Sequence, residues 1–206
     1  MTRPRIVRRV RVSSVHGLAG GIADLTSGDD GRAEAAVQAL AQEGLAAIPP
    51  LSHLLRSSDE DRRWWAVRAI AEIDHPNART LLVQALHDPA SAVRQCAAIG
   101  LRGHADEAAL SALLEALGSP DRMLARLASD ALAAAGSLAF EALIEALSSP
   151  NAEVRIGAAR ALARSGDGRT IPTLYAALDD SSALVRHYAE DGLERLGLGY
   201  VYFQPS

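Results

Sequence analysis

Apolar residues recur along this chain three and four residues apart, in segments that repeat every 30 or 31 residues. Four segments align without gaps, and two weaker copies precede them. Each of the six repeats begins with a leucine: Leu25, Leu55, Leu86, Leu117, Leu147 and Leu178. A fixed period of this length is typical of stacked structural repeats. The pattern therefore predicts six copies of one helical unit.

The second half of each repeat predicts a helix whose buried face carries small residues. In LHDPASAVRQCAAIGL at 86–101, Ala97 is followed four residues later by Leu101, and Gly100 stands just before that leucine. The alanine recurs in all six repeats, as Ala36, Ala66, Ala97, Ala128, Ala158 and Ala189. Small residues at this spacing let helices approach closely, so we expect this face to pack against its neighbours.

The first half of each repeat predicts another helix, as in ALSALLEAL at 109–117, where apolar residues again stand three and four apart. An Asp-Pro or Ser-Pro pair separates the two helices in three repeats. We expect its Asp or Ser to cap the following helix, with proline at the first helical position. Each repeat is therefore predicted to be a helical hairpin, and stacked hairpins would share one continuous core.

The pattern D-P-x-x-x-V-R-x-x-A-A-x-x-L at 88–101, which recurs as PNAEVRIGAARAL at 150–162, resembles the HEAT-repeat family. It is most similar to the short bacterial repeats shared with phycobiliprotein lyases. The resemblance implies an all-α fold, a right-handed α-solenoid of about six hairpins. It also implies that the second helix of each hairpin lines a concave groove.

The same resemblance implies a ladder of Asp–Arg pairs that ties the repeats together. We expect Arg94 to be held by Asp88 or by the Asp of a neighbouring turn, and Arg186 by Asp179 or Asp180. The fourth repeat departs from the pattern, with Ala125 at the arginine position. The fifth repeat has Ser149 and Asn151 in place of Asp, so the ladder is expected to be incomplete there.

The chain divides into a basic arm at 1–14, a helical solenoid at 15–198 and an aromatic tail at 199–206. The net charge is −4, but residues 1–12 carry five arginines and no acid, so the remainder carries −9. We expect the tail to fold back over the last repeat, as terminal repeats need a cover. Insertion of the tail into a partner is the alternative.

Two adjacent tryptophans lie on a second helix, which is predicted to line the groove. Counting positions in the second helix from the residue equivalent to Val93, Trp64 occupies position three, opposite the buried face, and Trp65 occupies position four at its edge. We therefore expect Trp64 to be exposed and to contact a partner, and Trp65 to be half-buried. Arg160, at position seven, is expected to point outward without an acidic partner. The predicted partner-binding residues are Trp64, Trp65, Arg68, Ile99, Arg126, Leu127, Ile156, Arg160, His187 and Tyr188.

The sequence lacks the residue patterns that mark most catalytic sites. It has one cysteine, Cys96, and no lysine, which excludes internal disulfides and Schiff-base chemistry. None of its six histidines is followed by Glu, unlike the His-Glu pairs of the HEAT-repeat deoxyhypusine hydroxylases. His187, Asp191 and Arg195 could form an acid/base row, and a solvated salt-bridge row explains them equally well. No catalytic residue, metal or cofactor is expected.

We interpret the chain as a non-catalytic scaffold that binds another protein or a peptide segment in its concave groove. One alternative is a bilin (chromophore) lyase or a subunit of one. Another is nucleic-acid binding through the arm residues Arg3, Arg5, Arg8, Arg9 and Arg11. Nucleic acid is the less expected partner, because the groove carries ten arginines and six acids and becomes balanced when four ladder arginines are set aside. No segment predicts a membrane span or a signal peptide, and a cytoplasmic location is expected.

Overall fold

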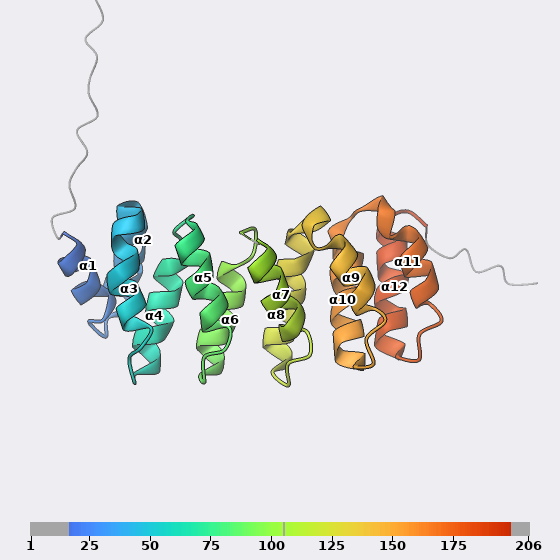
Figure 1. Cartoon of the computed structure of the whole chain (residues 1–206), viewed down its shortest axis with the longest axis horizontal. Coiled ribbons are helices and arrows are strands. Elements are labelled where there is room, and N and C mark those ends of the chain that lie inside the picture. Colours follow the sequence, from blue (N-terminus) through green and yellow to red (C-terminus); the bar gives the residue numbers. More distant parts are fainter. Residues whose placement is uncertain (1–16, 105, 199–206) are drawn as a thin grey trace, which may run out of the picture.

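A computed structural model of the chain describes residues 17–104 and 106–198, and their regular secondary structure is helical, without strands. Twelve α-helices form pairs, and the pairs follow one another along the long axis of the molecule in the order of the sequence (Figure 1). They form six hairpins stacked side by side, which confirms the predicted α-solenoid. The predicted arm at 1–14 and tail at 199–206 lie outside the described residues.

Each hairpin contributes a first and a second helix, with bounds close to those expected. The first helices are α1 (Leu18–Leu25), α3 (Ile48–Leu54), α5 (Pro76–Ala85), α7 (Glu107–Ala116), α9 (Phe140–Ala146) and α11 (Ile171–Ala177). The second helices are α2 (Asp30–Glu43), α4 (Glu60–Ile70), α6 (Ser91–Gly100), α8 (Arg122–Ala134), α10 (Ala152–Ser165) and α12 (Ala183–Arg195). Three short 3-10 helices join some of the hairpins: η1 (Gly44–Ala47), η2 (Gly136–Leu138) and η3 (Gly168–Thr170).

The turns inside the hairpins cap the second helices, but not in the predicted way. In α8 the capping residue is Asp121, whose side chain accepts hydrogen bonds from the amides of Met123 and Leu124. Pro120 therefore precedes the cap and is not the first helical residue. The physical reason is the hydroxyl of Ser119, which accepts a hydrogen bond from the Asp121 amide and completes the turn one residue earlier.

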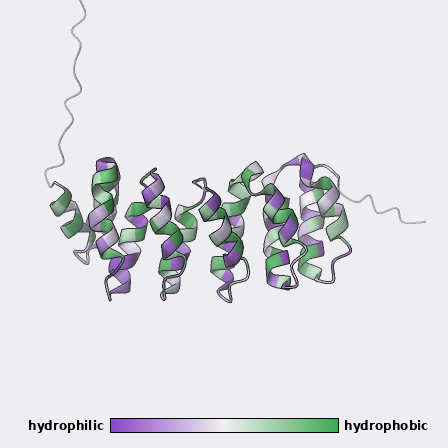
Figure 2. Cartoon of the chain, in the orientation of Figure 1, coloured by the Kyte–Doolittle hydropathy of each residue, from purple (hydrophilic) through white to green (hydrophobic). Residues whose placement is uncertain are grey.

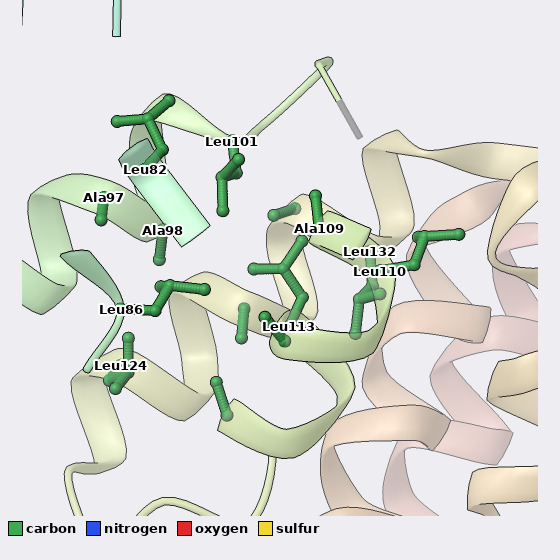
Figure 3. Packing of buried hydrophobic residues seen from close by; sticks show 14 of the residues in the cluster. Leu82, Leu86, Ala97, Ala98, Leu101, Ala109, Leu110, Leu113, Leu124 and Leu132 are labelled. Carbon is green, nitrogen blue, oxygen red and sulfur yellow. The ribbon is translucent and has the colours of Figure 1, made fainter. Parts of the chain in front are cut away.

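The core is one continuous layer of Ala and Leu side chains between the two rows of helices. The recurring alanines of the second helices are at most 4% exposed, as expected. Each helix carries hydrophobic and hydrophilic residues together (Figure 2). Leu82 and Leu101 of the third hairpin and Leu113 of the fourth gather in the same layer (Figure 3).

Position six of the second helices is also buried, which the sequence analysis did not predict. Its occupants in the first five repeats are fully buried: Val37, Val67, Ala98, Ser129 and Ala159. A second helix is covered by its own first helix and by the second helices on both sides. Its buried face is therefore wider than the single stripe of an ordinary surface helix.

The row of second helices is packed more tightly than the row of first helices. Neighbouring pairs such as α8 with α10 and α10 with α12 contact each other extensively, whereas α3 with α5 and α7 with α9 touch over a small area. Glycine makes the approach possible at Gly192 of α12, where an added Cβ would lie 2.9 Å from the Cα of Ala163 in α10. Because the second helices are closer together, they form the inner, concave side of the array.

Within the described residues, every helix is too short or too polar to span a membrane.

Candidate functional site

The arginine ladder of the family is present, and it runs between repeats. The Arg63 guanidinium donates from Nε and Nη2 to the two carboxylate oxygens of Asp88, at 2.8 and 3.0 Å, and from Nη1 to the Ser57 carbonyl at 2.9 Å. Arg155 makes the equivalent bonds to Asp180, at 2.9 and 3.2 Å, and to the Ser149 carbonyl. These hydrogen bonds hold the pKa of Asp180 below its ordinary value.

The carboxylates of Asp88 and Asp180 therefore bind the arginine of an earlier repeat. The prediction that they would bind Arg94 and Arg186 of their own repeats is wrong. Arg94 donates to the backbone carbonyl of Asp88 at 2.7 Å and reaches the carboxylate of Asp121, in the next turn, at 3.4 Å. Arg186 likewise binds the Asp180 backbone carbonyl at 2.6 Å. The side chain of Arg94 is long enough to bind a carbonyl of its own repeat and a carboxylate of the next repeat at the same time.

Two gaps interrupt the ladder within the described residues. The arginine position holds Ala33 in the first repeat and Ala125 in the fourth. The gap after Ala125 coincides with Ser149 and Asn151, so both halves of that pair are missing together, as the sequence predicted. Each gap adjoins a hollow on the concave side of the array.

The hollow beside the first gap, here called the N-terminal hollow, has a volume of about 660 Å³. It is acidic and aromatic, and its main lining residues are Asp30, Glu34, Asp59, Asp61, Trp64 and Trp65. The two tryptophan rings meet edge to face, with centroids 4.8 Å apart and planes at 86°.

Trp64 is not the fully exposed residue that the sequence predicted. It is half-buried and packs against the core, as Trp65 does. Its ring packs against the Trp65 ring, and this contact removes apolar surface of both rings from water. Both rings still line the N-terminal hollow, so Trp64 retains a surface that a ligand could contact.

The hollow beside the second gap, the C-terminal hollow, lies where α8, α10 and α12 adjoin and has a volume of about 380 Å³. Arg122, Arg126 and Arg160 give it a positive lining, and Ile156, Leu184 and Tyr188 give it an apolar one. Four of the predicted site residues meet here: Arg126, Ile156, Arg160 and Tyr188. The sequence analysis missed Arg122 and Leu184, which precede the part of the helix that it considered.

Arg160 contradicts its expected orientation. Its side chain is only 11% exposed, with Nη2 2.9 Å from the Asp130 carboxylate and Nη1 donating to the Arg126 carbonyl at 2.9 Å. Asp130 occupies position seven of α8, directly across from Arg160 at position seven of α10. Close packing of the two helices brings these equivalent positions together, so Arg160 is a structural link as well as a lining residue.

The remaining predicted residues are spread along the concave side. Arg68 of α4 is paired with Glu34 of α2 at 2.8 Å and also with Glu72. Ile99 is 58% exposed, and Leu127 is half-buried against the core. His187 is exposed and lies against Tyr188, with ring centroids 5.5 Å apart.

The polar row of α12 forms an exposed ion pair. The Nε atom of Arg195 lies 2.8 Å from the Asp191 carboxylate, one helical turn away. Within the described residues, no group of three His, Cys, Asp or Glu side chains is placed to hold a metal ion.

Charge on the concave side is separated along the array and is not evenly mixed. Acidic side chains gather at the N-terminal hollow, and arginines gather at the C-terminal hollow. The count of six arginines against six acids, taken over the whole groove, hides this separation. Only the stacking of the repeats shows which charges share a hollow.

The single cysteine is a core residue and not a nucleophile. Cys96 is 7% exposed, and burial raises the pKa of its thiol to about 11, although the guanidinium of Arg68 partly offsets this effect. A thiolate is the reactive form of cysteine, so this thiol is inert at neutral pH.

We expect Cys96 to react with a disulfide reagent such as DTNB about 100-fold more slowly in the native chain than in urea at pH 8, because the folded thiol is mostly protonated and shielded. The measurement is the rate of thionitrobenzoate release. Equal rates in the two states would contradict the burial of this thiol.

Comparison with known proteins agrees with the architecture. The model of the HEAT repeats family matches residues 48–133 and 110–194. The chain therefore belongs to the HEAT-repeat family, as its turn and ladder residues predicted.

The sequence of the chain is similar to that of one curated protein, a lyase subunit. Phycocyanobilin lyase subunit beta of Pseudanabaena tenuis is 37% identical over 118 residues, in an alignment that covers 51% of this chain and 42% of the relative. The chain thus spans less than half the length of that relative. The solved complex of CpcE and CpcF of phycocyanin lyase from a Nostoc species is 22% identical with a TM-score of 0.52, covering 95% of this chain and 82% of the other.

A designed armadillo repeat protein in complex with the peptide (KR)4 is also similar, at 21% identity and a TM-score of 0.50, covering 87% of this chain and 99% of the other. At such identities, the two solved structures establish the fold alone.

The interpretation of this chain as a non-catalytic scaffold is corrected by these findings. The relative found by sequence is a lyase subunit, and a lyase complex shares the fold over nearly the whole chain. The findings favour the chromophore-lyase alternative. Missing catalytic motifs in the sequence do not exclude this alternative.

Proposed function

We propose that this chain is a subunit of a bilin lyase and takes part in attaching a bilin to a phycobiliprotein. The observation that carries the proposal is the 37% identity to phycocyanobilin lyase subunit beta. Fold alone would not support it, because HEAT-type arrays serve many unrelated functions. The likeness to the CpcE–CpcF complex in turn supports a second HEAT-repeat subunit as partner.

The chemistry of the chain favours a binding role within such an enzyme. Cys96 is its one cysteine and is buried, so the chain offers no thiol for a covalent bilin intermediate. The acceptor thiol would belong to the phycobiliprotein. The contribution of this subunit is then to hold the bilin or the acceptor protein on its concave side.

The experiment is reconstitution of bilin transfer. Apo-phycocyanin, phycocyanobilin and a partner lyase subunit are combined with and without this chain, and covalent bilin is measured as chromophore that stays with the protein on a denaturing gel. We expect the initial rate of attachment to rise at least about tenfold when the chain is present, as for a modest catalytic contribution of about 1.4 kcal/mol.

The matched control is the same chain unfolded by heat before addition. The proposed function is ruled out for this acceptor and bilin if the rate of bilin attachment is the same with the folded chain, with the heated chain and without the chain. Each phycobiliprotein subunit available as an apoprotein should therefore be tried as acceptor.

A further inference from the structure

We propose that the C-terminal hollow is the bilin-binding site, with Arg122 and Arg126 facing the carboxylates of the tetrapyrrole and Ile156 and Tyr188 contacting its flat rings. This inference rests on the proposed function for the identity of the ligand. The hollow itself is defined by the geometry and charge of the described residues.

The two hollows occupy equivalent places in the repeat, which allows an internal comparison. Each lies at a gap in the ladder, where alanine replaces arginine. At the first gap the next second helix carries Trp64 and Trp65, and these rings occupy part of the space. At the second gap the equivalent residues are Ile156 and Gly157, so neither of these two positions places an aromatic ring in the hollow.

The charge of the two hollows is reversed at equivalent positions. Asp30 and Glu34 of the N-terminal hollow correspond to Arg122 and Arg126 of the C-terminal hollow. Burial does not explain this exchange, because all four side chains lie on the surface. The substitution changes which ligand the hollow attracts, from a cation to an anion.

The positive charge of the C-terminal hollow is only weakly neutralised. In residues 17–104 and 106–198, no ion pair involves the guanidinium of Arg122 or Arg126. At the first gap, Arg68 pairs with Glu34, but its equivalent Arg160 faces Arg126 and pairs with Asp130 instead. Glu153 is the one carboxylate in the lining, opposite three arginines.

The rest of the lining suits a flat apolar body. Leu184 is 53% exposed and stands one turn before Tyr188 on α12, and Ile156 of α10 lines the same hollow. Exposed apolar side chains next to guanidinium groups match a ligand with carboxylates on a conjugated ring system. A volume of about 380 Å³ with an open mouth leaves part of a tetrapyrrole uncovered, as transfer to an acceptor requires.

The floor of the hollow is held in place by the scaffold. The Ser129 hydroxyl donates to the Gly157 carbonyl at 2.9 Å, which ties α8 to α10. Gly157 lies too close to Leu117 for a side chain. Binding therefore needs little rearrangement of the two helices, which favours affinity.

The test is a titration of the full chain with free phycocyanobilin, followed by bilin absorbance and by quenching of tryptophan fluorescence. The double variant Arg122→Gln, Arg126→Gln removes the positive charge, and Ala125→Met fills the hollow without changing charge. We expect each to raise the Kd about tenfold or more, as loss of a charged contact or of space would. The matched control, Arg56→Gln with Arg102→Gln, removes two exposed arginines that lie outside both hollows and should leave Kd within about twofold.

A second ligand separates carboxylate recognition from ring contact. Phycocyanobilin dimethyl ester lacks the charges, so it should bind the wild type more weakly and bind the arginine double variant as it binds the wild type. Urea unfolding of every variant shows whether the fold is retained. If Ala125→Met proves unfolded, the arginine variant and the ester still decide the question.

Three results would overturn the inference: no bilin binding by the wild type, unchanged Kd in both hollow variants, or a defect confined to capture of apo-phycocyanin. The proposed function fails separately. Arginine-dependent bilin binding without transfer in any reconstitution would support the site and refute the lyase role. If the Arg122→Gln, Arg126→Gln variant transfers bilin and binds bilin as well as the wild type does, the lyase role is supported and the site is refuted.

Discussion

Replacing Arg63 with alanine is expected to lower the free energy of unfolding by about 3 kcal/mol. Arg63 and Asp88 both have side chains that are 10% exposed, and the pair is joined by two parallel hydrogen bonds. Removal of the arginine leaves a buried carboxylate without its cation and a Ser57 carbonyl without its donor. The loss should exceed that at any surface arginine of the chain.

Urea unfolding monitored by circular dichroism measures this effect, and Arg62→Ala provides the control. Arg62 is the preceding residue on the same helix, but its side chain is 54% exposed and its contact with Asp59 is 3.5 Å long. Its removal should cost about 0.5 kcal/mol or less. Equal losses for the two variants would show that the ladder contributes nothing beyond an ordinary surface charge.

Acid titration gives the Arg63 prediction an independent signature. Burial raises the pKa of Asp88, but hydrogen bonds from Arg63 and the Ala90 amide outweigh it and hold the pKa below the ordinary value. A carboxyl with a lowered folded-state pKa stabilises the fold above its unfolded pKa and loses that contribution as pH falls through the folded one. The wild type should therefore lose stability on acidification, and Arg63→Ala should lose less.

Gly192→Val is expected to lower the free energy of unfolding by about 2 kcal/mol. An added Cβ at Gly192 would lie 2.9 Å from the Cα of Ala163 and 2.8 Å from the Leu174 side chain. Helix propensity alone would slightly favour valine over glycine inside α12. The clash with the backbone of α10 should decide the outcome, because the two helices cannot separate without breaking the row of second helices.

The same substitution at Gly168 is the control, since an added Cβ there has no atom within 4 Å and the backbone is not left-handed. Gly168→Val should change stability by less than about 0.5 kcal/mol, as for other surface substitutions. Thermal or urea unfolding decides the comparison. A Gly192→Val chain as stable as the Gly168→Val chain would mean that α10 and α12 do not pack closely at this point.

Much of the fold could be predicted from the sequence because the signal is local and repeated. The alanine at position five and the Leu or Ile at position nine recur six times, and both are buried wherever they occur. Because the same spacing occurs in six repeats, one unusual sequence, such as the tryptophan pair, does not change the predicted helices. Ala125 and Ser149 could likewise be recognised as a gap in the ladder, because neighbouring repeats supply the comparison.

The candidate site was predicted less well, because its residues come from three repeats. Arg126, Ile156, Arg160 and Tyr188 were expected on the concave side, and they do line one hollow. Their mutual arrangement depends on how α8, α10 and α12 stack. One signal in the sequence could have located the hollow. Equivalent positions of two repeats carry opposite charges, Glu34 in the first and Arg126 in the fourth.

The sequence by itself determined the number of hairpins, the helix that carries the small residues and the place where the ladder breaks, since helical periodicity and repeat identity are properties of short segments. Tertiary structure alone decided that Arg63 reaches Asp88 in the next repeat, that Arg160 pairs with Asp130, and that position six is buried. These contacts form between segments about 25 to 30 residues apart in the chain. Their geometry follows from the distance and rotation between stacked hairpins, which no single repeat encodes.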